Sequence, residues 1–495
     1  MTELHLPWLE LAILAPVFGA LWTAGVRDPE EAQRRSLIMT GAALVCTIGA
    51  WLDFAWIAAP EAHDRWSLVA SIVGSERLSL DRISAPLLPM AALVYFVTVL
   101  ATLRTKVRRM SFSWMLVSEA LLLATFSCRD PWGVIALLAL GVVPPLIELR
   151  SRGKPTRVFA LHMAAFITLL IAGGMIAYRG QASGPAPIAA VVLLLVAVLI
   201  RNGVAPAHCW LTDLFEHATF GSALLFVTPM VGVYAAVRLV LPIAPEWALR
   251  SMSLLSLATA VYAAGMALVQ KEARRFFCYV FLSHSSLVLV GLETATPIGL
   301  TGALCLWISV GLALTGFGLT LRAVESRSGR VSLADYHGLY DHMPKLAMFF
   351  LLTGLASIGF PGTIGFVGGE LLVEGVVGVY PFVGLAVVLA AALNGIAVMQ
   401  AYFRVFTGKR HVASISLGSR WQEQAAVLAL AVLIVGGGLV PQPGLIARRD
   451  AADQILESRR AVLPAAAEAN PDSEQPLWFA DETASDIQTL SLIHI

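Results

Sequence analysis

The sequence predicts an all-α polytopic membrane protein with about 14 transmembrane helices, and two observations carry this prediction. Hydrophobic residues make up 58% of the 495 residues and charged residues only 14%, whereas soluble domains carry about 25% charged residues. The apolar segments reach about 20 residues, the length of one helical crossing and about twice that of a barrel strand. A net charge of +1 provides no basic surface for a nucleic acid.

Fourteen apolar segments follow one another along the chain. They are 6–26, 36–59, 84–103, 111–128, 131–149, 158–178, 186–203, 220–242, 251–270, 276–294, 299–321, 345–372, 376–403 and 424–443. The loops on one side of this arrangement hold 22 of the 34 Lys and Arg residues, and the loops on the other side hold 7. Because cytoplasmic loops carry the excess of basic residues, we expect a multi-pass protein of the inner (plasma) membrane with both termini on the non-cytoplasmic side.

Two of the segments are interrupted by Gly and Pro. Segment 7 meets Gly203 and Pro206, and segment 12 meets Pro361 and Gly362. Non-helical backbone at membrane depth persists only where protein or water covers it. The breaks lie five segments apart, which predicts two five-helix repeats with the second inverted, an arrangement typical of ion-coupled transporters. Two ordinary proline kinks are the alternative interpretation.

These features divide the chain into five regions. They are 1–110 with helices 1–3, 111–245 with the first five-helix repeat, 246–410 with the second, inverted repeat, 411–445 with the last transmembrane helix, and 446–495 as a polar tail. In the tail we expect a short helix followed by disorder. Its last six residues match one reading frame of a common sequencing adaptor. We therefore expect that these residues replace the natural continuation of the chain, and we assign them no function.

Four ordered stretches resemble the motifs of one family. Residues 206–213 (PAHCWLTD) resemble P-x-H-x-W-L-P-D, and residues 272–284 resemble D-x-K-R-x-x-A-Y followed by S-H. Residues 355–366 resemble S-x-G-x-P-G-x-x-G-F, and residues 78–84 resemble a D-x-x-S motif before span three. These motifs belong to the proton-conducting antiporter-like subunits of respiratory complex I. Related subunits occur in membrane-bound hydrogenases, multi-subunit sodium/proton antiporters and inorganic-carbon uptake complexes. The resemblance covers roughly residues 75–410 and implies fourteen helices with inverted repeats.

At the positions where the family has its proton-path residues, this sequence mostly has side chains that cannot release a proton. The corresponding positions are Ala139, Arg201, Met230, Val310 and, in span 13, Asn394 or Gln400. Arg stays protonated in proteins, so Arg201 in place of the family's lysine holds a fixed charge. The resemblance therefore implies a retained scaffold with a degenerate proton path.

Six titratable residues remain candidates for a proton pathway. They are Glu119, Arg201, His208, Asp213, His284 and Glu370. Ionisable groups kept inside a membrane bundle are normally functional. Arg201 is either a fixed charge inside the bundle or a cation that reaches the cytoplasmic interface. We expect His208 and Asp213 to cap the helix after the break, with proton loading as the alternative.

The remaining candidates have equally open interpretations. Glu119 is the one acid inside span 4, and it either pairs with His162 in span 6 or is a protonated, hydrogen-bonded acid. Glu370 follows the second break and is either a proton exit or part of a solvated rim.

No GxGxxG, HExxH or CxxC motif is present, so we expect no catalytic residue, no cofactor and no metal site. The sequence predicts an antiporter-like membrane subunit of a proton- or cation-translocating complex of the NADH:quinone oxidoreductase type, and at most a non-redox subunit. Its expected partners are other membrane subunits, the lipid bilayer and protons or sodium ions. Two roles stay open within this function. The chain either conducts protons through the remaining titratable groups, or it docks partner subunits without conducting protons, and the second role is favoured. The alternative functions are a membrane partner in an inorganic-carbon uptake complex and a subunit of a multi-subunit sodium/proton antiporter.

Overall fold

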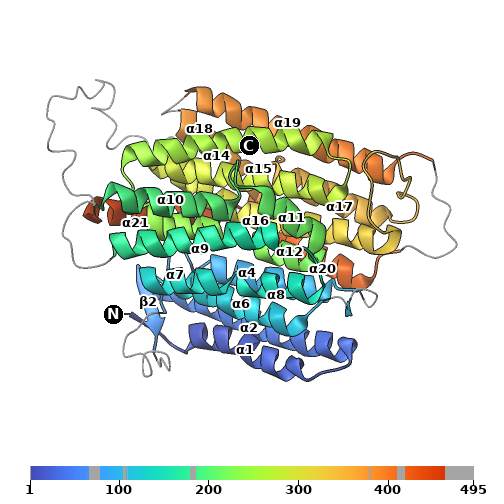
Figure 1. Cartoon of the computed structure of the whole chain (residues 1–495), viewed down its shortest axis with the longest axis horizontal. Coiled ribbons are helices and arrows are strands. Elements are labelled where there is room, and N and C mark those ends of the chain that lie inside the picture. Colours follow the sequence, from blue (N-terminus) through green and yellow to red (C-terminus); the bar gives the residue numbers. More distant parts are fainter. Residues whose placement is uncertain are drawn as a thin grey trace.

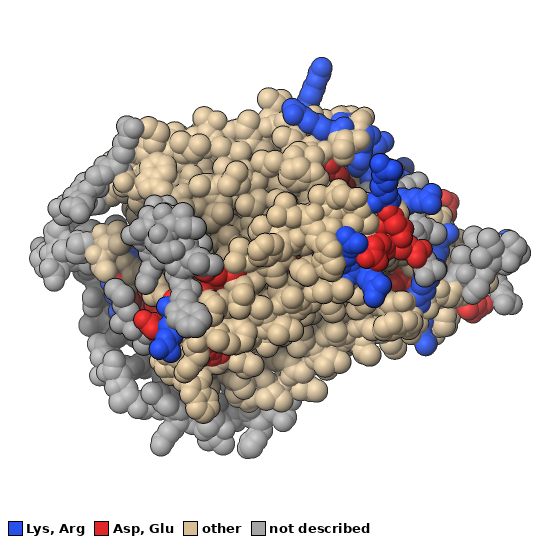
Figure 2. All heavy atoms as spheres, turned by 90° about the horizontal axis from the view of Figure 1, so that it is seen from below, with Lys and Arg blue, Asp and Glu red and all other residues tan. Residues whose placement is uncertain are grey.

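The computed structural model is a bundle of helices that run side by side along one axis (Figure 1). It describes residues 2–65, 78–103, 107–108, 110–178, 186–377, 381–409 and 418–462. Lys and Arg side chains gather at one end of this bundle, on the right in Figure 2, which we call the basic end. The N-terminus lies at the opposite end (Figure 1). On the face seen in Figure 2, the flank between the two ends shows few charged side chains, as a membrane-spanning surface requires.

Nine helical segments of the described residues are long and apolar enough to cross a membrane. They are α2 (Pro29–Ile57), α7 (Pro131–Leu140) with α8 (Val143–Ser151), α9 (Arg157–Ala177), α12 (Phe220–Val227) with α13 (Val231–Ala235) and the π-helical turn η1 (Ala236–Val240), α14 (Glu246–Val269), α15 (Ala273–Glu293), α16 (Pro297–Ser328), α19 (Pro381–Phe406) and α20 (Trp421–Leu439).

Five shorter apolar helices fill the remaining positions of the predicted order. They are α1 (Trp8–Ala24), α4 (Leu87–Leu100), α6 (Phe112–Ser127), α10 (Ile188–Asn202) and α17 (Pro344–Ser357). With these five helices added to the nine long segments, each of the fourteen predicted spans contains a helix in the described part of the chain. Multi-pass helical architecture is therefore confirmed, while the inverted symmetry of the two repeats stays a prediction.

Both predicted helix breaks are present. α10 ends at Asn202, Gly203 adopts a φ of +70°, and the chain becomes helical again in α11 (Cys209–His217). α17 ends at Ser357, Gly362 adopts a φ of +87°, and α18 (Ile364–Val377) follows. Glycine reaches positive φ without steric penalty, so both breaks use the residue type that such a turn requires.

Several helices begin where the sequence places a capping residue directly before proline. The carboxylate of Asp130 accepts a hydrogen bond from the backbone N–H of Gly133 at 2.7 Å, and the hydroxyl of Thr296 accepts one from Gly299 at 3.2 Å. Pro131 and Pro297 occupy the first helical position, where a missing N–H is harmless. These caps fix where α7 and α16 start.

The end opposite the basic end carries a small sheet and an additional helix. Strands β1 (Thr2–Leu4), β2 (Glu61–Asp64) and β3 (Leu80–Asp81) pair in the order β1-β2-β3. Helix α21 (Gln442–Val462) packs against α16 and buries Arg448. The predicted short helix of the tail is thus present, and residues 463–495 lie outside the described residues.

Helices α15 and α16 form the centre of the bundle. In the apolar stretch of each helix, nearly every residue is buried inside the protein. α15 packs mainly against α14 and α16, and α16 packs mainly against α18, α17 and α15. Polar side chains on α15 are therefore shielded from lipid, and their hydrogen bonds depend on neighbouring helices or on internal water.

Candidate functional site

Arg201 lies in the last turn of α10, directly before the first break, and its side chain points into the bundle. Only 6% of the residue is exposed. Its Nη2 donates a long hydrogen bond of 3.4 Å to the carbonyl oxygen of Phe226. The guanidinium also lies over the Phe226 ring at 4.1 Å and beside the Trp210 ring at 5.6 Å. The interpretation of Arg201 as a cation at the cytoplasmic interface is therefore wrong.

No carboxylate of the described residues lies within ion-pair distance of Arg201. Aromatic faces and the C-terminal end of a helix both favour a cation. The charge of Arg201 is thus held by rings and backbone dipoles, and it cannot be neutralised by transfer of its own proton.

A row of small cavities starts near the basic end and leads to Arg201. The first cavity, of about 30 Å³, is lined by Glu148, Ser222, Ser118 and Phe226 among others. The second, also of about 30 Å³, shares Ser118 and Phe226 with the first and extends to Arg201. A cavity holds a water when it offers about 10–15 Å³ and two or more polar partners. Each of these two cavities meets that condition.

A third cavity continues the row on the other side of Arg201. It measures about 10 Å³ and is lined by Asn202, Met230 and Ser285 in addition to Arg201. Met230 occupies the position that the resemblance assigns to a lysine, and its φ of +51° is uncommon for a residue with a side chain. Ser285 belongs to α15, so the row passes from the first predicted repeat to the second. Arg201 borders two of the three cavities and stands in the middle of the row.

Glu119 is buried in α6, and neither of its carboxyl oxygens has a hydrogen-bond partner among the described residues. The preceding residue, Ser118, shares a 2.8 Å hydrogen bond with the hydroxyl of Tyr95 and lines both of the first two cavities. Since neither carboxyl oxygen has a partner among the described residues, the pairing of Glu119 with His162 of α9 is absent, and the alternative of a hydrogen-bonded acid finds no protein partner either. Glu119 is placed beside the row and not within it.

His208 and Asp213 lie on the basic-end side of the break. His208 precedes α11, but its side chain accepts no capping hydrogen bond from the first turn, and its buried Nδ1 has no partner among the described residues. The ring packs instead against Tyr262 at 5.5 Å and Tyr279 at 6.2 Å. Asp213 pairs with His217 at 3.1 Å. The prediction that His208 caps α11 is therefore wrong.

His284 and Glu370 occupy opposite kinds of environment. His284 is buried on α15, and its Nε2 has no partner among the described residues. The neighbouring Ser283 accepts a 2.7 Å hydrogen bond from Asn394 of α19 and donates one to the carbonyl of Ala260 on α14. Glu370 is exposed on α18. The structure thus brings His284 into the bundle core and leaves Glu370 at the surface.

Two acids that the sequence analysis did not select are also buried. Glu148 accepts a 2.9 Å hydrogen bond from the backbone N–H of Thr219, at the start of α12, and lines the first cavity. Glu293, the last residue of α15, is 4% exposed. Both stand at the ends of apolar segments, where a sequence alone does not distinguish a buried acid from an interfacial one.

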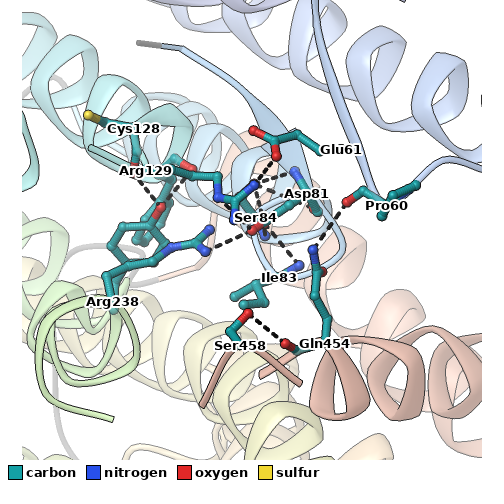
Figure 3. A network of polar contacts seen from close by, with 12 residues as sticks. Pro60, Glu61, Asp81, Ile83, Ser84, Cys128, Arg129, Arg238, Gln454 and Ser458 are labelled. Atoms are coloured by element: carbon teal, nitrogen blue, oxygen red, sulfur yellow. Dashed lines mark hydrogen bonds and ion pairs between the residues drawn. The ribbon is translucent and has the colours of Figure 1, made fainter. Parts of the chain in front are cut away.

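A polar network ties together the end opposite the basic end (Figure 3). The carboxylate of Asp81 accepts hydrogen bonds from Ser84, pairs with Arg238 at 2.7 Å and lies 3.7 Å from Arg129. Arg129 also pairs with Glu61 of β2. Burial alone would raise the pKa of Asp81, but the Arg238 guanidinium outweighs it and lowers this pKa to about 2. Asp81 is thus charged at neutral pH, and its pairing with Arg238 joins the loop before span 3 to span 8.

Helix α21 covers the same end. The Arg448 guanidinium donates a 2.8 Å hydrogen bond to the carbonyl of Arg82, and Gln454 donates one of 3.3 Å to the carbonyl of Pro60 (Figure 3 shows Gln454 and Pro60). Arg459 donates a 2.6 Å hydrogen bond to the carbonyl of Leu241. These contacts connect the last described helix to loops that precede span 3 and follow span 8.

Known proteins share both the sequence pattern and the architecture. The family model described as "NADH:quinone oxidoreductase/Mrp antiporter, TM" matches residues 159–394. Over its whole length the chain is 26% identical to an NAD(P)H-quinone oxidoreductase chain 4 of Nostoc sp., of which it covers 99%.

Two solved structures show the same fold. A chain of respiratory complex I from Thermus thermophilus gives a TM-score of 0.74 at 24% identity, covering 90% of this chain and 99% of that one. A chain of the Mrp complex from Dietzia sp. gives a TM-score of 0.77 at 18% identity, covering 92% and 99%. The chain is thus similar over its whole length to antiporter-like membrane subunits of the NADH:quinone oxidoreductase type, and residues 159–394 match their family model.

Proposed function

We propose that the chain is a membrane subunit of a multi-subunit complex of the NADH:quinone oxidoreductase type. Its likeness to NAD(P)H-quinone oxidoreductase chain 4 extends over the whole length of both proteins, which supports this assignment. The alternatives, an Mrp-type antiporter and an inorganic-carbon uptake complex, have weaker support, since the Mrp chain is only 18% identical.

We also propose an orientation in the plasma membrane, with the basic end facing the cytoplasm and both termini on the other side. The concentration of Lys and Arg at one end supports it (Figure 2).

The observation that carries the functional proposal is the placement of Arg201 between two cavities. Water in the row would offer protons a path from Glu148 to Ser285, but a fixed guanidinium repels them in a low-dielectric interior. A lysine could release its proton and pass it on, whereas an arginine does not. In this proposal the chain binds neighbouring membrane subunits. It also holds water in the row of cavities, and the charge of Arg201 prevents protons from passing along that row.

The assignment to a complex can be tested by purification from native membranes in a mild detergent. A tag placed after residue 462 lies beyond α21 and its contacts. We expect the tagged chain to bring down other polytopic subunits together with a redox-active arm that reduces a quinone. Recovery with a soluble zinc enzyme of the inorganic-carbon type, or with antiporter subunits that lack a redox partner, would contradict the proposal. Mock purification from untagged cells provides the control.

A further inference from the structure

Helix α15 carries three buried polar side chains on one side. Ser283, Ser286 and Glu293 fall within an arc of about 80° of the helix at 3.6 residues per turn. On this side Ser283 bonds to Asn394 and Ala260, the hydroxyl of Ser286 makes no hydrogen bond with any described residue, and the carboxyl of Glu293 faces the hydroxyl of Ser256 on α14. Buried polar groups in proteins are nearly always satisfied by protein or by ordered water. This side of α15 is therefore a place where internal water or an exchangeable proton belongs.

Glu293 is the only carboxyl in this line, and nothing on the surrounding helices neutralises it. The hydroxyl of Ser256 on α14 faces the carboxyl and interacts with it as a hydrogen-bonding group, but it carries no charge. On α14 the charged residues Glu246 and Arg250 pair with each other at the surface.

The other helices packed against α15 engage their charges elsewhere as well. On α10 and α11, Arg201 bonds to the Phe226 carbonyl, Asp213 pairs with His217, and Glu216 pairs with Arg275. The acids of α18, Glu370 and Glu374, are exposed. On α16 the charged residues belong to the basic end, where Glu325 pairs with Arg274 and Arg327 pairs with Glu423. On α19, Arg404 lies in the last turn and donates to the Ala334 carbonyl.

The position of Glu293 disfavours its ionised form in two ways. An unpaired carboxylate is costly to bury in an apolar interior, far more so than a neutral carboxyl group. Glu293 is also the last residue of α15, and the negative end of a helix dipole repels an anion. A bound proton relieves both penalties at once.

The same position brings Glu293 close to water at the end opposite the basic end. The residues that follow it, 294–296, are partly exposed, and Pro297 is exposed. Towards the bundle centre, Ser286 lies about 10 Å away along the helix, and Ser285, next to it, lines the third cavity. Glu293 thus stands between the surface and the far end of the cavity row.

We propose that Glu293 is a proton-binding site that exchanges with water at the end of the molecule opposite the basic end and faces the row closed by Arg201. The site binds one proton per carboxyl and contains no metal. The side of the membrane from which the proton arrives rests on the proposed orientation, whereas the proton binding itself does not.

An apolar carbodiimide tests the site, because it modifies protonated carboxyl groups in apolar surroundings. Membranes with the assembled complex are treated between pH 5.5 and 9, and the peptide that contains Glu293 is analysed by mass spectrometry. We expect modification of Glu293 that decreases as the pH rises and disappears in Glu293→Gln. The exposed Glu246, which pairs with Arg250, is the internal control and should remain unmodified.

Three further outcomes separate the components of the proposal. If Glu293 stays unmodified at every pH while the equally buried Glu119 reacts, Glu293 is not a proton site. If sodium ions at constant pH protect Glu293, the site binds Na⁺ and the assignment to a proton is wrong. If Glu293→Gln lowers complex yield while Glu293→Asp preserves it, the carboxylate is structural, and the proposal fails.

Vesicles of known orientation test the direction of access. In right-side-out vesicles, raising the external pH at constant internal pH should lower the rate of modification several-fold. Control of the rate by the internal pH would contradict the proposed orientation and leave proton binding intact. The failure of the site and the failure of the topology are thus distinguishable.

Discussion

The guanidinium carbon of Arg201 lies 4.1 Å from the centroid of the Phe226 ring, although the two residues belong to different helices. Arg201 ends α10, and Phe226 lies near the end of α12, next to the first two cavities. A ring face is the strongest interaction available to this cation, because no described carboxylate approaches it. The contact holds the positive charge in the middle of the row.

Phe226→Leu should loosen this arrangement. The substitution keeps an apolar side chain but removes the aromatic ring. The interaction of a desolvated cation with such a ring stabilises the folded state by about 2 kcal/mol. We expect a lower melting temperature of the purified chain, measured in detergent. Phe159→Leu is the matched control, since Phe159 packs on the same two rings, Trp210 and Phe226, without contacting Arg201. Equal losses in the two variants would show that packing alone is measured.

Asp81→Asn should be strongly destabilising. Asp81 and Arg238 form a buried pair at 2.7 Å, and removal of one partner leaves the other charge uncompensated, at a cost of about 3–5 kcal/mol. The double variant with Arg238→Gln should recover part of the loss, which a double-mutant cycle on thermal stability measures. Arg250→Gln breaks an exposed pair and should change stability by about 0–1 kcal/mol. Additive effects at Asp81 and Arg238 would contradict the pairing.

Asp64 should make stability depend on pH. Its carboxylate accepts hydrogen bonds from the N–H groups of Leu9 and Glu10 at the start of α1, but burial raises its pKa to about 6. The folded state therefore binds this proton more tightly than the unfolded state, and the contribution of Asp64 to stability is lost as the pH rises from about 4 to 6. The melting temperature of the natural chain minus that of Asp64→Asn should decrease between pH 4.5 and 7.5. A constant difference would contradict the raised pKa.

The two ends of α14 should be accessible from opposite sides of the membrane. Glu246 and Lys271 flank this helix and are both exposed. In a Cys209→Ser background, which removes the exposed cysteine, an impermeant maleimide should modify Glu246→Cys in intact cells and Lys271→Cys only after the cells are opened. The reverse pattern would invert the proposed orientation.

The helices and their breaks were predictable because they depend on local signals. Apolar length marks each span, and Gly203 and Gly362 supply the positive φ that the breaks require. Long-range contacts left no such signal. Asp81 and Arg238 are far apart in sequence, and only the packing of span 3 beside span 8 brings them together.

The site residues show the same limit. The sequence identified Arg201 as a fixed charge but did not decide whether it reached the interface, because its direction depends on Phe226 and Trp210. Glu293 was missed because an acid at the end of an apolar run looks interfacial, and its burial depends on α14, α16 and α18. The expected cap at His208 failed because two tyrosine rings provide a competing surface for the imidazole.

The most direct test of the closed row is proton flux through Arg201→Lys. The complex is reconstituted into liposomes with a pH-sensitive dye inside, and a proton gradient is imposed without redox turnover. A buried lysine can release its proton, so we expect Arg201→Lys to conduct protons several-fold faster than the natural chain. Arg322→Lys changes a partly buried arginine near the basic end that lines none of the three cavities and should leave the flux unchanged. If the natural chain already conducts as fast as Arg201→Lys, Arg201 does not close the row.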